Sequence, residues 1–106
     1  MKAKIHHKLI LVGQAEVERT TLAVCDEDLL GKVFEEGDAI LDLKTYRSFY
    51  DGESVTEAEA IELIKAAKSM NIVGKKSIAA ARKAIGVSEK SVKKIGEVPH
   101  LQVYYI

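Results

Sequence analysis

The sequence predicts an α+β fold in which a small antiparallel or mixed sheet carries two α-helices packed on one face. Apolar and β-branched segments lie at both ends of the chain, and two segments with helical spacing, 56–70 and 75–85, lie between them. The 106 residues include 47% hydrophobic and 30% charged side chains, which are globular values and exclude wholesale disorder. We therefore expect a single domain over residues 1–106.

The first quarter of the chain predicts a β-hairpin followed by one helical turn. Residues 3–12 and 20–25 are rich in aliphatic and β-branched side chains and flank a glycine turn signal, so we expect them to pair in antiparallel fashion. Residues 26–31 begin with acidic side chains, which the helix dipole favours, and end at Gly31.

Residues 38–44 alternate in polarity, which predicts a half-buried strand, and residues 45–54 predict a loop with an Asp51-Gly52 turn. Half of the aromatic side chains lie in this loop, where we expect them to cover an edge of the core; the alternative is that they stack on exposed bases. They are Tyr46, Phe49 and Tyr50.

The helix over 56–70 begins with Thr56 as a cap and Glu59 three residues later, which is the pattern of a capping box. Residues 71–73 then read as a short extended link. The second helix, 75–85, is preceded by Gly74, which we expect to have a positive φ or to allow a close backbone approach. It is followed by Gly86, and strands are predicted at 91–95 and 101–105.

Composition narrows the class of protein. A single cysteine excludes a disulfide-stapled scaffold. The aliphatic run Leu9–Val12 is too short for a membrane span or a signal peptide, so we expect a cytoplasmic protein with no membrane partner.

The net charge of zero conceals two halves of opposite sign. Residues 1–64 hold seven Lys and Arg against fourteen Asp and Glu, whereas residues 65–106 hold nine against two. A split of this size can favour a charged partner, unless the two halves fold against each other and neutralise their charges.

The second helix is the candidate nucleic-acid site. At 100° per residue its four basic side chains fall within an arc of ~120°, beside a stripe of Ile78, Ala81 and Ile85 that would face the core. Free amides at the Gly74 end could add an anion site. The alternative is an ordinary solvated basic face. The proposed RNA- or DNA-contacting residues are Gly74, Lys75, Lys76, Arg82 and Lys83.

Other chemistry-bearing motifs are weaker. Residues 73–77 resemble the end of a phosphate-binding P-loop, but Ser69 replaces its first glycine and Lys76 separates the lysine from the hydroxyl, which excludes that class of hydrolase. Asp26, Asp28 and His100 are weak candidates for a metal site. The alternative is a purely structural role, in which the two acids lie at the start of a helical turn and the histidine follows a turn. No catalytic residue and no cofactor is predicted. Cys25 is expected to pack as a small apolar side chain.

Five blocks in this order resemble a small archaeal family known as domain of unknown function 424, over about residues 20–102. They are Ala23-Val24-Cys25-Asp26-Glu27-Asp28-Leu29-Leu30-Gly31-Lys32, Phe34-Glu35-Glu36-Gly37, Phe49-Tyr50-Asp51-Gly52, Asn71-Ile72-Val73-Gly74 and Ile95-Gly96-Glu97-Val98-Pro99-His100. The chain departs from that pattern at Glu97, where the family has a second glycine, and in its longer first hairpin. The resemblance implies an archaeal cytoplasm and a loose association with translation or other RNA processes.

We therefore expect a non-enzymatic binding module whose partner is RNA or a ribonucleoprotein. The alternatives are a small metal-dependent phosphoryl-transfer or nuclease enzyme, and a protein-interaction module whose acidic half docks a basic partner.

Overall fold

The computed structural model describes residues 1–104 as a mixed α/β fold with a six-stranded sheet, a separate two-stranded sheet and three α-helices. The large sheet has the strand order β5-β1-β2-β6-β8-β7. Its strands are β1 (Lys2–Val12), β2 (Ala15–Cys25), β5 (Glu53–Ser54), β6 (Ser69–Val73), β7 (Lys93–Ile95) and β8 (Val98–Tyr104). The remaining elements are η1 (Glu27–Leu29), β3 (Val33–Glu36), β4 (Ala39–Asp42), α1 (Arg47–Tyr50), α2 (Glu57–Ala66), α3 (Lys75–Ile85) and η2 (Glu89–Ser91).

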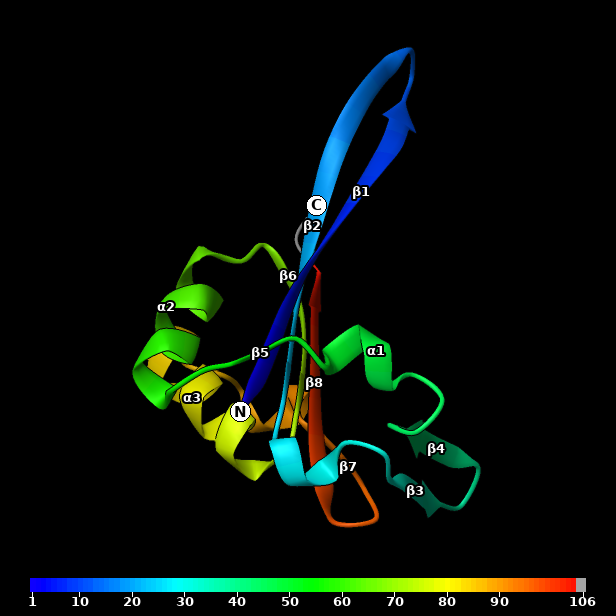
Figure 1. Ribbon diagram of the computed structural model, residues 1–106, viewed down its shortest axis with the longest axis vertical. Helices are drawn as coiled ribbons and strands as arrows, with labels where there is room; N and C mark the ends of the chain where they lie inside the picture. Colours follow the sequence, from blue (N-terminus) through cyan, green and yellow to red (C-terminus); the bar gives the residue numbers. More distant parts are fainter. Residues whose placement is uncertain (105–106) are drawn as a thin grey trace.

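The large sheet separates two apolar clusters. Figure 1 shows α2 and α3 on one side of the sheet, and α1 with the β3–β4 hairpin on the other. Ile64 of α2 and Ile78 of α3 share a cluster with Ile72 of β6. On the other side, Tyr50 and Leu43 share a second cluster with Cys25 and Val73. The coarse prediction of a mixed sheet with helices is confirmed, and the short third helix was not predicted.

The predicted hairpin is confirmed and is longer than expected. β1 and β2 pair in antiparallel register from Lys2 opposite Cys25 to Val12 opposite Ala15. β5 pairs only with the first two residues of β1, and β6 only with the last four of β2. The remainder of the hairpin therefore projects from the body as a two-stranded arm (Figure 1).

The helix predicted over 56–70 is correct at its start and wrong at its end. Thr56 and Glu59 form both bonds of the capping box. The helix stops at Ala66, and residues 69–73 form β6, a fully buried central strand parallel to β2. A short strand buried on both faces lacks alternation, which is why its apolar residues predict the end of a helix and an extended link instead.

The other predicted elements fit with smaller changes. α3 has the predicted bounds, and Gly86 ends it in the left-handed conformation with φ of 62°. The predicted 45–54 loop contains the short helix α1 and the strand β5. The strand predicted at 91–95 begins at Lys93, and the strand predicted at 101–105 begins earlier, at Val98; Tyr105 lies outside the described residues.

The β7–β8 turn has a backbone conformation that favours glycine at both of its central residues, Gly96 and Glu97. Gly96 and Glu97 connect the strands with φ of 54° and 68°, and Glu97 is the non-glycine residue with positive φ among residues 1–104. Positive φ at both central residues is the requirement of a type I′ hairpin turn. A side chain at the second position adds steric strain of about 1–2 kcal/mol.

We predict that Glu97→Gly raises the free energy of unfolding by up to about 1 kcal/mol. The gain comes from the strain that is relieved, reduced by the greater flexibility of glycine in the unfolded chain. Urea unfolding of the two proteins measures it. Glu97→Ala, which retains the Cβ, is the control and should bring no such gain; equal stability of all three proteins contradicts the strain argument.

Candidate functional site

The N-terminus of α3 is held by a side chain from another part of the chain. Asp26 directly follows β2, is only 6% exposed, and its backbone N–H donates to the Val73 carbonyl at 3.1 Å. Its carboxylate accepts hydrogen bonds from the Lys76 N–H at 3.0 Å, the Ser77 N–H at 2.8 Å and the Ser77 hydroxyl at 2.7 Å. Amides that an α-helix leaves unpaired at its start are thus satisfied, and a negative charge lies at the positive end of the helix dipole.

Gly74 is the residue that allows this contact. Its φ is 106°, and a Cβ placed there would lie 2.3 Å from Cγ of Asp26. Its N–H donates to the Pro99 carbonyl at 2.9 Å. Both expected properties of Gly74, a positive φ and a close approach, are confirmed. The ends of β2 and β6, the start of α3 and the start of β8 therefore meet at one joint.

A cavity of about 350 Å³ opens beside this joint. Lys75 and Lys76 line it together with Asp28, Glu97 and Pro99. The expectation that the helix amides are open to a phosphate is wrong, because Asp26 already occupies the anion position at this helix end. Any anion that binds here would contact lysine side chains at the rim of the cavity.

The four basic residues of α3 are all exposed, but they fall into two pairs. Arg82 donates two hydrogen bonds to the Glu89 carboxylate, at 2.8 and 3.1 Å, and Lys83 lies 2.6 Å from the Glu57 carboxylate. Within residues 1–104, neither Lys75 nor Lys76 forms an ion pair with a carboxylate. The free positive charge of α3 is therefore concentrated at its N-terminal end.

The buried stripe of α3 differs in part from the predicted one. Ile78 and Ala81 are buried as expected, but Ile85 is exposed. Ala80 and Ser77, which are not part of the predicted stripe, are fully buried. The predicted stripe was too narrow because α3 packs against both α2 and the sheet, and because Ser77 turns inward to Asp26.

Lys94 is a basic residue that the sequence did not single out. It lies on the edge strand β7, directly opposite Pro99 of β8, and is exposed. Cross-strand partners share one face of a sheet, so Lys94 lies on the side of the sheet that Pro99 presents to the cavity. We call Lys75, Lys76 and Lys94 the basic surface. The strand register places Lys94 on the same sheet face as Pro99 of the cavity, which helical periodicity alone could not find.

The weak metal candidates do not converge. Both carboxylate oxygens of Asp26 accept hydrogen bonds from α3, Asp28 is exposed in η1, and His100 lies in β8 opposite Val73. In the described part of the chain, no three His, Cys, Asp or Glu side chains come together in an arrangement that could hold a metal ion.

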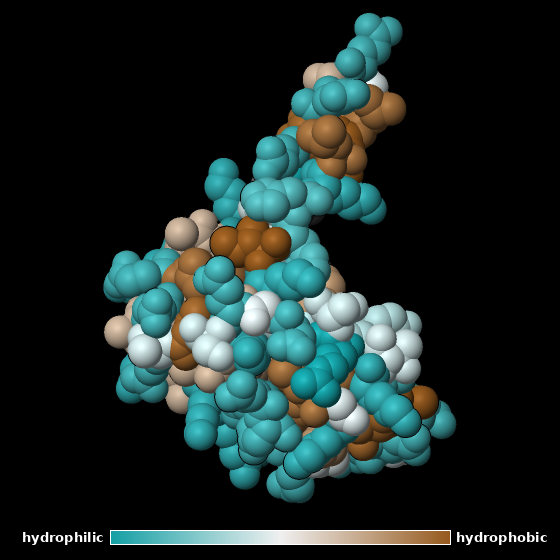
Figure 2. Space-filling model, viewed as in Figure 1, coloured by the Kyte–Doolittle hydropathy of each residue, from teal (hydrophilic) through white to brown (hydrophobic). Residues whose placement is uncertain are grey.

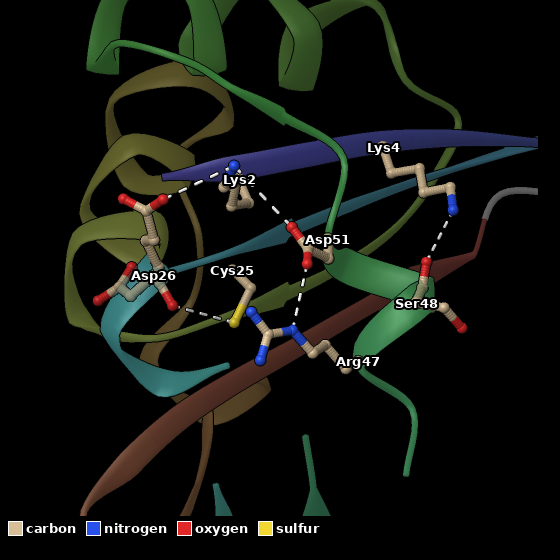
Figure 3. A network of polar contacts seen from close by, with 8 residues as sticks. Lys2, Lys4, Cys25, Asp26, Arg47, Ser48 and Asp51 are labelled. Atoms are coloured by element: carbon tan, nitrogen blue, oxygen red, sulfur yellow. Dashed lines mark hydrogen bonds and ion pairs between the residues drawn. The ribbon is translucent and has the colours of Figure 1, made fainter. Parts of the chain in front are cut away.

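Cys25 lies beneath a network of surface ion pairs. Its thiol is fully buried and donates to the Asp26 carbonyl at 3.3 Å, and burial raises its pKa to about 12. The prediction that Cys25 packs as a small apolar residue is confirmed. Above it, Asp51 pairs with Arg47 at 3.1 Å and with Lys2 at 3.9 Å (Figure 3). A protonated, inaccessible thiol is unsuited to act as a nucleophile.

The aromatic cluster of the 45–54 segment covers an edge of the core, as expected. Tyr50 is buried, and Phe49 packs against the same cluster while its ring stacks on His6 at a centroid distance of 4.3 Å. Tyr46 is the exposed member of the three.

His100 is the titratable group of β8 whose surroundings disfavour its charged form. Burial lowers its pKa below the usual 6.5, and the positive charge of Lys93 lowers it further. Within the described residues, its buried Nε2 atom has no hydrogen-bond partner. The folded chain therefore takes up a proton at His100 less readily than the unfolded chain.

This difference predicts that acidification below about pH 6.5 lowers the free energy of unfolding, until the pH falls below the pKa of His100 in the folded chain. At higher pH the group is neutral in both states and has no effect. Urea unfolding at about pH 7 and about pH 5 measures the loss, and His100→Gln should reduce it. Asp42 and Glu59 have pKa values lowered below 3.8 and 4.5, so they titrate outside this window. Equal losses in both proteins contradict the assignment.

The comparisons with known proteins place this fold in a family. A family model described as "Protein of unknown function (DUF424)" matches residues 15–106. The chain belongs to this family. The resemblance seen in the sequence is thereby confirmed, and the whole of β1 lies outside the matched range of the domain of unknown function 424. No curated protein matches the chain.

A solved structure shares the fold of this family member. The crystal structure of an uncharacterized conserved protein from Methanopyrus kandleri aligns with a TM-score of 0.69 and 26% sequence identity. The alignment covers 94% of this chain and 90% of that protein, so the two folds correspond over nearly their whole lengths. Within residues 1–104, every helix is too short or too polar to span a bilayer.

Proposed function

We propose that this chain is a non-enzymatic cytoplasmic binding module that contacts the phosphate backbone of RNA, alone or within a ribonucleoprotein. The basic surface of Lys75, Lys76 and Lys94 makes the contact. The observation that carries the proposal is the division of α3: Arg82 and Lys83 are held by carboxylates, whereas the two lysines beside the cavity are exposed and form no ion pair within residues 1–104.

The arrangement of charge supports this proposal. Among the described residues, Lys83–Glu57 and Lys65–Glu62 are the only side-chain ion pairs between the basic half of the chain and the acidic half. The two halves therefore do not cancel each other by direct pairing, and the field of the basic half persists at the surface. Lysine binds phosphate as a point charge, which suits contact with a backbone independent of sequence.

The state of two reactive side chains near the cavity, Asp26 and Cys25, also favours binding over catalysis. The Asp26 carboxylate is committed to capping α3, and the thiol of Cys25 is buried and protonated at neutral pH. Asp26 lines the cavity, but both of its carboxylate oxygens accept hydrogen bonds from α3, and Cys25 is not among the lining residues.

We predict that replacing the three lysines of the basic surface with alanine weakens RNA binding. The salt dependence of binding should fall by roughly two counterions, because each lost phosphate contact releases about 0.7 counterion fewer from a single strand. The measurement is the affinity for an oligouridylate and for a short RNA duplex at two salt concentrations.

Two matched variants serve as controls. Arg82→Ala with Lys83→Ala removes two charges that are already neutralised, so it should change the salt dependence less than the triple variant. Asp28→Asn should leave binding unchanged or strengthen it, because it removes a negative charge beside the lysines. Asp26 is unsuited as a control since it caps α3. The proposal is overturned if the parent does not bind RNA at low salt. It is also overturned if the triple lysine variant shows the same salt dependence of binding as the parent.

A further inference from the structure

The projecting arm, residues 7–20 of β1 and β2, lies beyond the contacts of Lys4 and His6 with α1 and exposes apolar side chains on both of its faces. Leu9, Leu11 and Val12 are 66%, 73% and 55% exposed, and Val17 is also exposed. Figure 2 shows apolar residues near the end of the projection. Contiguous apolar side chains far from the core favour a surface that a partner covers.

The two faces of the arm carry opposite charge. The register places Leu9 and Leu11 with Glu16 and Glu18 on the side of α2 and α3, because this face continues the buried residue Leu22. The other face continues the side on which His6 stacks on Phe49 at the base of the hairpin, and we call it the basic arm face. It consists of Lys8, Ile10, Val12, Val17 and Arg19.

Lys8 and Arg19 lie directly opposite each other on the basic arm face. Like charges in that position destabilise a hairpin. Both side chains are exposed, and neither forms an ion pair within residues 1–104. The pair therefore favours an anionic surface placed against this face.

A surface of complementary character lies on the same side of the large sheet. Phe34 and Leu41 of the β3–β4 hairpin face the core, so Val33, Glu35, Ile40 and Asp42 form its outer face. A cavity of about 490 Å³ adjoins it, lined by Ile40, Asp42 and the exposed ring of Tyr46 among others. We call these five residues the acidic groove: Val33, Glu35, Ile40, Asp42 and Tyr46.

The charge of the groove matches that of the arm. The β3–β4 hairpin and its turn carry the acids Glu35, Glu36, Asp38 and Asp42, with Lys32 and Lys44 just outside the hairpin. Hydrogen bonds from the Thr45 and Lys44 N–H groups lower the pKa of Asp42, which keeps it ionised. Apolar and acidic side chains thus alternate in the groove, as apolar and basic side chains do on the arm.

We propose that the basic arm face of one chain packs into the acidic groove of a second copy, and that the reciprocal contact completes a twofold dimer. In one chain the arm points away from β3–β4, so it does not fill its own groove (Figure 1). A twofold axis relates the two contacts, so that the arm of each chain meets the groove of the other.

The second copy fits these observations better than RNA does. An RNA backbone offers no apolar counterpart to Val12 and Val17, and Glu16 and Glu18 on the other face would repel it. The basic surface lies beside α3, on the opposite side of the large sheet, so the dimer leaves it open.

The molar mass in solution tests this proposal. We expect the parent to show twice the chain mass of 11.7 kDa by light scattering after size-exclusion chromatography. The arm reversal Lys8→Glu/Arg19→Glu should give a monomer. So should the groove reversal Glu35→Lys/Asp38→Lys, which changes Glu35 of the groove and Asp38 of the adjoining β3–β4 turn. An equimolar mixture of the two variants should recover the doubled mass, because each arm then meets a groove of opposite charge.

The apolar part of the contact has a matched control on the arm itself. Val12→Ser/Val17→Ser on the basic arm face should give a monomer, whereas Leu9→Ser/Leu11→Ser on the other face should remain a dimer. A monomeric parent, a dimer that survives the arm reversal, equal effects of the two serine pairs, or a mixture that stays monomeric overturns the proposal. None of these outcomes depends on whether the chain binds RNA.

Discussion

The buried carboxylate of Asp26 connects the end of β2 to the first turn of α3, and the positions of several other groups depend on that contact. Because Asp26 accepts hydrogen bonds from two helix amides and from the Ser77 hydroxyl, the start of α3 is fixed beside the parallel strands β2 and β6. Gly74 must then lack a side chain. Its N–H, turned toward the Pro99 carbonyl, brings β8 to the same point.

This joint also decides what the site can bind. The carboxylate fills the position in which a helix N-terminus would hold a phosphate, so the site has lysine side chains instead of backbone amides to offer an anion. Lys75 and Lys76 extend from the turn that Asp26 fixes, and the β7–β8 register sets Lys94 on the same side. In the RNA-binding role that we propose, these charges would contact the phosphate backbone without reading its sequence.

Local signals in the sequence predicted the elements that local interactions define. Gly86 ends α3 and Thr56 with Glu59 starts α2, because both are contacts within a few residues. β6 was missed since its burial on both faces depends on strands far away in the chain. For the same reason, sequence spacing found the arc of four basic residues but not the carboxylates of Glu57 and Glu89 that neutralise half of it.

The contact between Asp26 and Ser77 joins residues 51 positions apart, and the order of residue types along the chain does not predict it. The nearest signals were an aspartate directly after a strand and a glycine directly before a helix. Similarly, alternation in residues 3–12 and 20–25 predicted strands but not their exposure, because pairing with β5 and β6 is limited to the base of the arm.

A double-mutant cycle on Asp26 and Gly74 tests the central role of the joint most directly. The variants are Asp26→Ala, Gly74→Ala and their combination, and urea unfolding gives the free energy of each. Asp26→Ala should cost about 1–3 kcal/mol through the amides left unpaired. Gly74→Ala should cost more than its backbone strain of about 1–3 kcal/mol, because the new Cβ also meets the carboxylate. The account predicts that the double variant loses at least about 1 kcal/mol less than the sum of the single losses. Additivity within about 0.5 kcal/mol would show that the two residues act independently and would contradict it.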